Sequence, residues 1–227
     1  MTSTDLPPAL RALAASLVDA DKLARFAGAR PERGARAAAV LALLEVAAED
    51  TYVVVAERAS TLRHHAGQLA FPGGGTEPQD ADLAATAVRE ASEEVGLDPT
   101  SADVLGVLPA VHVAVSGFDV TAVVAWWRDP HPLTVLEPGE VAAVHRIGVA
   151  VLADPATRVQ VVHPSGYTGP GFVVEHLLIW GLTAHLLDGV LELGGWARPW
   201  DHSRTADIPA RYLTDRRRDP PGGPDAH

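Results

Sequence analysis

Cysteine is absent from this sequence, and its absence excludes several kinds of site. Without thiols a protein forms no disulfide, holds no zinc through thiolates and has no cysteine nucleophile. Basic residues are also few, because 18 Lys and Arg stand against 29 Asp and Glu and leave a formal net charge of −11. A general nucleic-acid binder needs the opposite balance, since Lys and Arg must neutralise the phosphates. Chemistry on a phosphate group would therefore depend on a few placed cations or on a metal ion.

We expect neither a leader peptide nor a membrane span. The first residues, MTSTDLPP, contain no basic segment followed by an apolar core, and no apolar run has the length of a membrane-spanning helix. We therefore expect a cytoplasmic protein that has no membrane partner.

What is present is the composition of a folded protein. Hydrophobic residues make up 47% of the 227 residues, with 20 Gly and 18 Pro among them, and this balance is typical of a globular chain. The length suits one domain with extensions better than two domains. We expect an N-terminal helix and linker over residues 1–36, the main domain over 37–200, and a partly disordered extension over 201–227.

The spacing of apolar residues predicts both helices and strands, and therefore an α/β fold. It predicts helices over residues 8–26, 80–95 and 176–193. It predicts strands over residues 37–45, 51–58, 104–115, 118–127, 141–147 and 158–163, the first two as a hairpin. Residues 59–80 are rich in Gly, Pro and His, and they form a long irregular segment of the kind that is often functional.

The second of these helices has clear end signals. Asp80 is a candidate N-cap, and Asp82 suits the positive end of the helix dipole in the first turn. Gly96 stands where a left-handed residue ends a helix. These signals place the helix directly after the irregular segment.

Three glutamates lie close together on this helix. Glu90, Glu93 and Glu94 are spaced at i, i+3 and i+4, so a helix brings their side chains to one side. Such a triplet is more often a solvated surface, but here a Gly-rich segment precedes the helix and Arg89 flanks the glutamates. Three carboxylates on one face suit Mg²⁺ or Mn²⁺, which prefer oxygen ligands and neutralise phosphate charge. We interpret all three glutamates as metal ligands.

Around the glutamates the sequence resembles the Nudix hydrolases. Their signature reads Gly, five residues, Glu, seven residues and Arg-Glu-apolar-x-Glu-Glu-x-Gly-apolar, and it corresponds here to residues 75–97. Residues 89–97 (REASEEVGL) match its second half in full. The signature's first glutamate, which in the family supports the arginine, is replaced by Ala81. Asp80 and Asp82 on either side are the candidate substitutes.

A second stretch narrows the resemblance to one branch of that family. Residues 62–74 (LRHHAGQLAFPGG), with Arg58 before them, look like the extended motif of the coenzyme A pyrophosphatases. The segments 136–141 (LEPGEV) and 179–184 (IWGLTA) also resemble that branch, so the likeness spans roughly residues 37–193. It implies a Nudix α/β/α sandwich with a mixed β-sheet. It also implies hydrolysis of coenzyme A or its derivatives to 4′-phosphopantetheine and adenosine 3′,5′-bisphosphate.

The resemblance also assigns roles within the site. The residues expected to bind substrate are Arg58, Arg63, His65, Gln68, Gly73 and Gly74. Arginine pairs with phosphate oxygens and glycine permits close backbone approach, although each type alone is more often structural. The residues expected to act in catalysis are Glu93, Glu94 and Glu140. Glu140 lies in a Pro-Gly loop that suits a general base for the attacking water, and Glu93 is the competing base.

Two other interpretations stay open. One is a Nudix pyrophosphatase that acts on NADH, ADP-ribose or a damaged nucleotide, because a fold alone does not choose a substrate. The other is a non-catalytic Nudix-fold module that binds a ligand. Ala81 keeps this second interpretation open, although all three glutamates are present. In each case the partner is a small nucleotide-type molecule rather than a nucleic acid, and assembly as a homodimer stays open.

Overall fold

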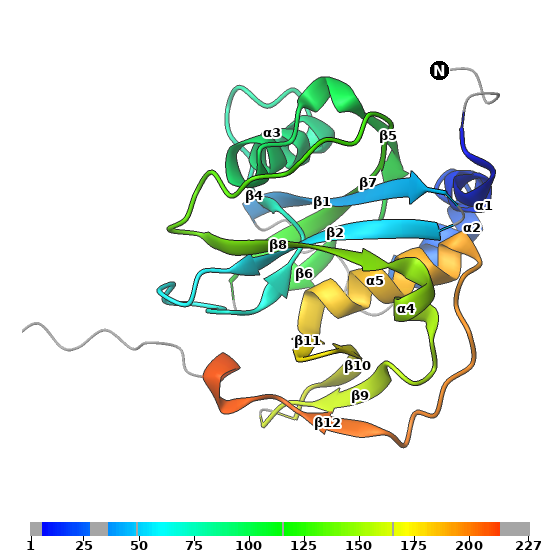
Figure 1. Cartoon of the computed structure of the whole chain (residues 1–227), viewed down its shortest axis with the longest axis vertical. Helices are drawn as coiled ribbons and strands as arrows, with labels where there is room; N and C mark the ends of the chain where they lie inside the picture. Colours follow the sequence, from blue (N-terminus) through cyan, green and yellow to red (C-terminus); the bar gives the residue numbers. More distant parts are fainter. Residues whose placement is uncertain (1–5, 28–35, 49, 115, 165, 214–227) are drawn as a thin grey trace, which may run out of the picture.

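A mixed β-sheet forms the frame of the molecule (Figure 1). The computed structural model describes residues 6–27, 36–48, 50–114, 116–164 and 166–213. The strands of this sheet are β1 (Arg36–Ala47), β2 (Asp50–Arg58), β3 (Leu69–Ala70), β4 (Gly73–Gly75), β5 (Ala102–Val107), β6 (Val111–Val113), β7 (Phe118–Trp127) and β8 (Val141–Gly148). The main path runs β3-β2-β1-β7-β5, while β4 pairs with β1, β6 with β7 and β8 with β2. Only the β1–β7 pair is parallel within this described sheet.

β1 lies at the centre of the sheet because both of its faces are apolar. Its sequence, RAAAVLALLEVA, is the nearly continuous hydrophobic run of a strand covered on both sides. Side chains alternate between the faces, so Leu41 and Leu43 pack toward one helical layer and Ala42 toward the other. The expected hairpin is confirmed, since β1 and β2 pair antiparallel through Leu44 and Val53.

Two helices cover opposite faces of the sheet, as the α/β/α sandwich requires (Figure 1). They are α3 (Leu83–Val95) and α5 (Gly181–Gly194). The expectation that Asp80 caps α3 is wrong, because Asp82 is the N-cap and its carboxylate accepts a hydrogen bond from the Ala85 amide at 2.8 Å. Gly96 ends α3 in the left-handed conformation, at φ 70°, as its sequence position predicted.

The N-terminal helix is broken rather than continuous over residues 8–26. A 3₁₀ turn (Pro8–Leu10) leads into α1 (Arg11–Ser16), and α2 (Ala20–Ala27) follows. The Asp19 carboxylate accepts the amides of Asp21 and Lys22, both at 3.1 Å, and so begins a new helix. Leu10 and Leu13 are fully buried in the core that α5 also joins. The expected linker continues into residues 28–35, which lie outside the described part of the chain.

A smaller four-stranded sheet follows in the second half of the chain. Its order is β11 (Leu177–Ile179), β10 (Thr168–Val174), β9 (Arg158–Val162) and β12 (Thr205–Asp207), and a short helix α4 (Val149–Ala153) precedes it. The helix expected over 176–193 starts later, because Leu177–Ile179 pairs with β10. The strand expected over 104–115 is divided into β5 and β6 around Pro109, which cannot donate to a ladder.

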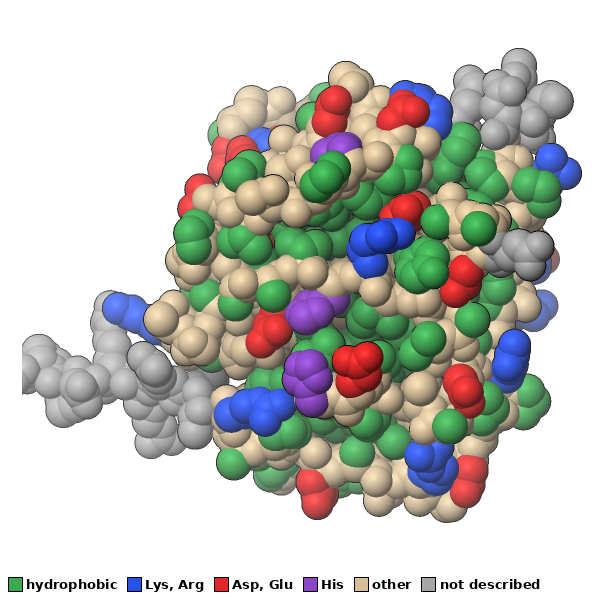
Figure 2. Space-filling view, in the orientation of Figure 1, with side chains coloured by type: hydrophobic (Ala, Val, Ile, Leu, Met, Phe, Trp, Pro, Cys, Tyr) green, Lys and Arg blue, Asp and Glu red, His purple; other side chains and the backbone are tan. Residues whose placement is uncertain are grey.

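Two further expectations concern the surface and the C-terminus. On the face shown in Figure 2, Lys and Arg side chains are scattered among acidic ones rather than gathered in a patch. No helix in the described ranges combines the length and apolarity that crossing a bilayer demands. Residues 201–213 are part of the described fold and include β12 and a 3₁₀ turn (Ala210–Tyr212), whereas the rest of the extension predicted to be disordered lies outside the described residues.

Candidate active site

The Gly-rich segment lies directly against the carboxylate helix. β4 pairs with β1 through Gly73, Gly74 and Gly75. A Cβ on Gly74 would come within 2.6 Å of Glu90 Oε1, and a Cβ on Gly73, at φ +157°, would collide with the backbone of β1. The Gly73 amide donates a hydrogen bond to Glu94 Oε2 at 3.2 Å. Glycine is needed here because backbone and carboxylates share the space that a side chain would take.

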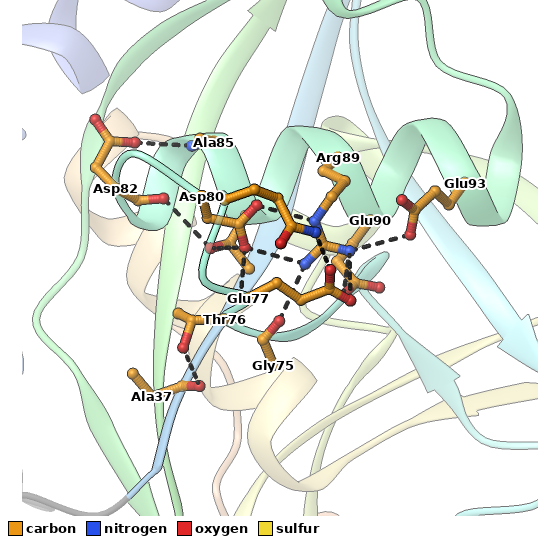
Figure 3. Close-up of polar contacts among 12 residues, drawn as sticks. Ala37, Gly75, Thr76, Glu77, Asp80, Asp82, Ala85, Arg89, Glu90 and Glu93 are labelled. Atoms are coloured by element: carbon orange, nitrogen blue, oxygen red, sulfur yellow. Dashed lines mark hydrogen bonds and ion pairs between the residues drawn. The ribbon is translucent and has the colours of Figure 1, made fainter.

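Arg89 organises the start of the site (Figure 3). Its Nε lies 2.9 Å from Asp80 Oδ1 and its Nη2 lies 3.1 Å from Asp80 Oδ2, which is a two-pronged pair. Nη2 also donates to the Gly75 carbonyl at 3.1 Å. Hydrogen bonds from Arg89 hold the pKa of Asp80 well below its usual range, and Asp80 in turn raises the pKa of Arg89. Asp80, rather than Asp82, thus supports the arginine at the position where Ala81 departs from the signature.

Glu90 and Glu94 are the carboxylates that the structure brings together with the glycines. The side chain of Glu94 is only 5% exposed, and its pKa is raised to about 7 by burial and, more weakly, by repulsion from Glu90 and Glu140. The Gly73 amide and the positive charge of Arg58 oppose this shift. Burial also raises the pKa of Glu90, with repulsion from Glu93 and Glu140 adding to it. A cation would relieve both carboxylates.

Glu93 has a different environment from its two neighbours. Its side chain is 55% exposed, and Oε2 forms an ion pair with Arg89 Nη1 at 3.0 Å (Figure 3). The same Nη1 lies 3.0 Å from Glu90 Oε1. Among the described residues, no three Asp, Glu or His side chains already stand together as a metal-binding group. The helix therefore supplies the three carboxylates on one side, as predicted, but their oxygens do not converge.

The loop of Glu140 is joined to the end of β2, beside Arg58. The Ala59 amide donates to the Glu140 carbonyl at 2.7 Å, which ties the loop of Glu140 to the residue after Arg58. Glu140 is exposed, and its charge acts on Glu90 and Glu94. Arg58 Nε is buried and has no hydrogen-bond partner among the described residues. A buried donor without a partner costs about 1–3 kcal/mol, so an acceptor that reached this nitrogen would stabilise the site.

The other predicted substrate residues lie in the loop between β2 and β3. Arg63 and His65 are exposed, and His65 adopts a left-handed backbone at φ 58°. His65 Nδ1 lies 3.2 Å from Gln68 Oε1, while Gln68 Nε2 donates to the Tyr212 carbonyl at 3.1 Å. Both the oxygen and the nitrogen of the Gln68 side-chain amide therefore have hydrogen-bond partners within the protein. Sequence reasoning missed Tyr212, because nothing local marks a residue 144 positions away as a partner of the loop.

Comparison with known proteins gives the family. The NUDIX domain model matches residues 35–164, more than half of the chain. NudL from Cronobacter sakazakii, described as an uncharacterized Nudix hydrolase, is 39% identical over 177 residues, which cover 73% of this chain and 88% of that relative. NudL from Salmonella paratyphi B, described in the same words, is 39% identical over 142 residues, which cover 60% and 71% respectively.

Solved structures include the Nudix hydrolase RenU from M. smegmatis, with 23% identity, a TM-score of 0.41, and coverage of 52% of this chain and 74% of that one. The signature helix, its arginine and the Gly-rich segment before it occupy the matched region of the domain model. The chain therefore belongs to the Nudix hydrolases, the divalent-metal-dependent diphosphatases of nucleotide-type substrates.

Proposed function

We propose that this Nudix hydrolase cleaves the diphosphate bond of coenzyme A or its derivatives, using Mg²⁺ or Mn²⁺, to 4′-phosphopantetheine and adenosine 3′,5′-bisphosphate. One observation carries the proposal. The segment that resembles the coenzyme A branch ends in Gly73 and Gly74, and these glycines contact Glu94 and Glu90. These contacts support a single site, formed by the segment whose sequence suggests the substrate and the helix whose carboxylates suggest the chemistry.

The carboxylates fit a hard divalent cation. Burial and mutual repulsion raise the pKa of Glu90 and Glu94, so an ion that accepts oxygen ligands would stabilise their charged forms. Glu93 would join them by leaving its ion pair with Arg89, and such exposed pairs contribute only about 1 kcal/mol or less. When bound, the metal would neutralise charge on the diphosphate and favour attack by water.

Arg58 is the residue best suited to hold the diphosphate. Its buried Nε lacks a partner among the described residues, and its charge is felt by Glu94. A phosphate oxygen would satisfy this donor, and the bond between two charged groups is about twice as strong as a neutral one. Arg63 is exposed in the following loop and is the candidate for the 3′-phosphate of coenzyme A.

Glu140 is the better placed of the two candidate bases. It is exposed to solvent water, and it lies close enough to Glu90 and Glu94 to raise their pKa values. Glu93 is held by Arg89 instead. Glu140 is therefore the proposed general base, and its carboxylate would accept a proton from the water that attacks a phosphorus of the diphosphate. A general base must reach both the water and the substrate.

A substrate panel tests the proposal. Catalytic efficiencies on coenzyme A, NADH and ADP-ribose are measured with Mg²⁺ and with Mn²⁺, and Glu94→Gln serves as the inactive control. Coenzyme A should be the best substrate by at least about tenfold. A preference for NADH or ADP-ribose would support a different Nudix pyrophosphatase. Binding of these ligands with no turnover of any of them would support a non-catalytic module.

A further inference from the structure

The C-terminal segment returns to the substrate loop and packs against it. After β12, which runs parallel to β9, the chain reaches the 3₁₀ turn Ala210–Tyr212. Tyr212 is 8% exposed, and it packs in a small apolar cluster with Val159, Val161, Leu178 and Ile208. This cluster belongs to the smaller sheet rather than to the core around the carboxylate helix. The turn is therefore anchored independently of the active site.

Two contacts join this anchor to the loop. Gln68 Nε2 donates a hydrogen bond to the carbonyl of Tyr212 at 3.1 Å. The Tyr212 ring lies over Gly67, because a Cβ on Gly67 would be 3.5 Å from Tyr212 Cε1, and Gly67 has a φ of +69° that disfavours other residues. Gln68 Oε1 lies 3.2 Å from His65 Nδ1, so the same side chain continues into the loop.

Two backbone hydrogen bonds join the end of the loop to Arg58. The Arg58 amide donates to the Gln68 carbonyl at 2.9 Å, and the Gly67 amide donates to the Arg58 carbonyl at 3.0 Å. These bonds close the loop at its base, next to Ala59 and the Glu140 loop. His65 stays in its left-handed conformation, at φ 58°, only while surrounding contacts hold it, since such a backbone is strained for a residue other than glycine.

We infer that Tyr212 is a positioning residue: it holds the loop of residues 58–68 in the shape that binds substrate, through Gln68 and Gly67. The kinetic part of this inference rests on the proposed role of that loop. Tyr212 touches no carboxylate of the site in any contact found among the described residues. Its loss should therefore weaken substrate binding and leave the chemical step largely intact.

The test uses four full-length variants. Tyr212→Ala removes the ring and so loosens the turn that carries the backbone carbonyl, Tyr212→Phe removes only the hydroxyl, and Leu213→Ala changes the neighbouring residue, which is 39% exposed. Gln68→Leu is added because it removes the hydrogen bond with the Tyr212 ring still in place. It keeps the test decisive if Tyr212→Ala does not fold.

The first readout is hydrogen exchange, which needs no substrate. In Tyr212→Ala and Gln68→Leu, amides of the peptide covering residues 58–68 should exchange at least about fivefold faster, whereas those of α3 should not change. Tyr212→Phe and Leu213→Ala should match the wild type. Unchanged exchange in the loop of both test variants would overturn the inference, whatever the substrate is.

The second readout is kinetic. KM for coenzyme A should rise about three- to thirtyfold in Tyr212→Ala, because the ring no longer packs over Gly67 and the loosened turn holds the carbonyl that Gln68 contacts less firmly, with kcat within about twofold of the wild type. Faster exchange with an unchanged KM would overturn the role in substrate binding. A wild type that does not hydrolyse coenzyme A would instead refute the proposed function, and the exchange experiment would still decide whether Tyr212 holds the loop.

Discussion

Replacing Glu94 by glutamine should stabilise the metal-free protein at pH 8 and, at the same time, abolish its turnover. The pKa of Glu94 is raised from an ordinary 4.5 to about 7, chiefly by burial. Between these two pH values the folded state keeps a proton that the unfolded chain releases, so the free energy of unfolding falls as pH rises from about 4.5 to about 7. Above that range the ionised carboxylate remains buried at a cost. Glutamine is neutral and of similar shape, and its carbonyl can still accept the Gly73 amide.

The magnitude follows from the size of the shift. Each pKa unit corresponds to about 1.4 kcal/mol, so Glu94→Gln should gain up to about 3 kcal/mol at pH 8 and almost nothing at pH 4.5. In a protein of this length, each kcal/mol of added stability raises the melting temperature by roughly 2–4 °C. Repulsion from Glu90 and Glu140 contributes less than burial does.

The assay is a pair of thermal or urea unfolding curves in a chelator, at pH 5 and at pH 8. Glu93→Gln is the matched control, because that carboxylate is mostly exposed and should change stability little. Added Mg²⁺ should stabilise the wild type and reverse the order of the two proteins, since a ligand that binds only the folded state raises its stability. A Glu94→Gln variant that is less stable than the wild type at pH 8 without metal would refute the account of a buried, repelled carboxylate.

Three further outcomes are expected. Gly74→Ala should lower kcat/KM by about tenfold or more while the protein stays folded, because its methyl group would displace the nearby carboxylate; wild-type efficiency would contradict the close packing. Glu140→Gln should reduce kcat far more than it changes KM, and if Glu93→Gln shows that pattern instead, the two bases must be exchanged. Arg58→Ala should cut kcat/KM by roughly ten- to a hundredfold on coenzyme A and dephospho-coenzyme A alike, whereas Arg63→Ala should penalise only coenzyme A; no loss in either variant on either substrate would contradict both assignments.

The elements that the sequence predicts well are those whose own pattern decides their structure. β1 and β2 are apolar runs that pair as neighbours in the chain, and α3 has its cap residues and its signature in one short stretch. The sequence predicts only part of α5 correctly, because the apolar residues before Gly181 suit a helix as well as a strand. Pairing with β10 decided between them, and that contact cannot be read from periodicity.

The candidate site likewise has residues that the sequence predicts and residues that depend on the tertiary fold. Residues 89–97 give the carboxylates from spacing alone, and the structure places Glu90 and Glu94 beside the glycines as a common site requires. The ion pair of Glu93 with Arg89 depends on rotamers, and the choice of Asp80 as the support of Arg89 depends on how the preceding turn folds back. The contact between Tyr212 and Gln68 could not be predicted from the sequence, because it joins two segments that only the tertiary fold brings together.

The most direct test of the central claim is mass spectrometry of the products formed from coenzyme A in ¹⁸O-labelled water, with Mn²⁺ present. Hydrolysis at the diphosphate predicts 4′-phosphopantetheine and adenosine 3′,5′-bisphosphate in equal amounts, with one ¹⁸O atom in one of the two products, and no such products from Glu94→Gln. Release of inorganic phosphate with dephospho-coenzyme A, or an intact coenzyme A under conditions in which another diphosphate is cleaved, would contradict it.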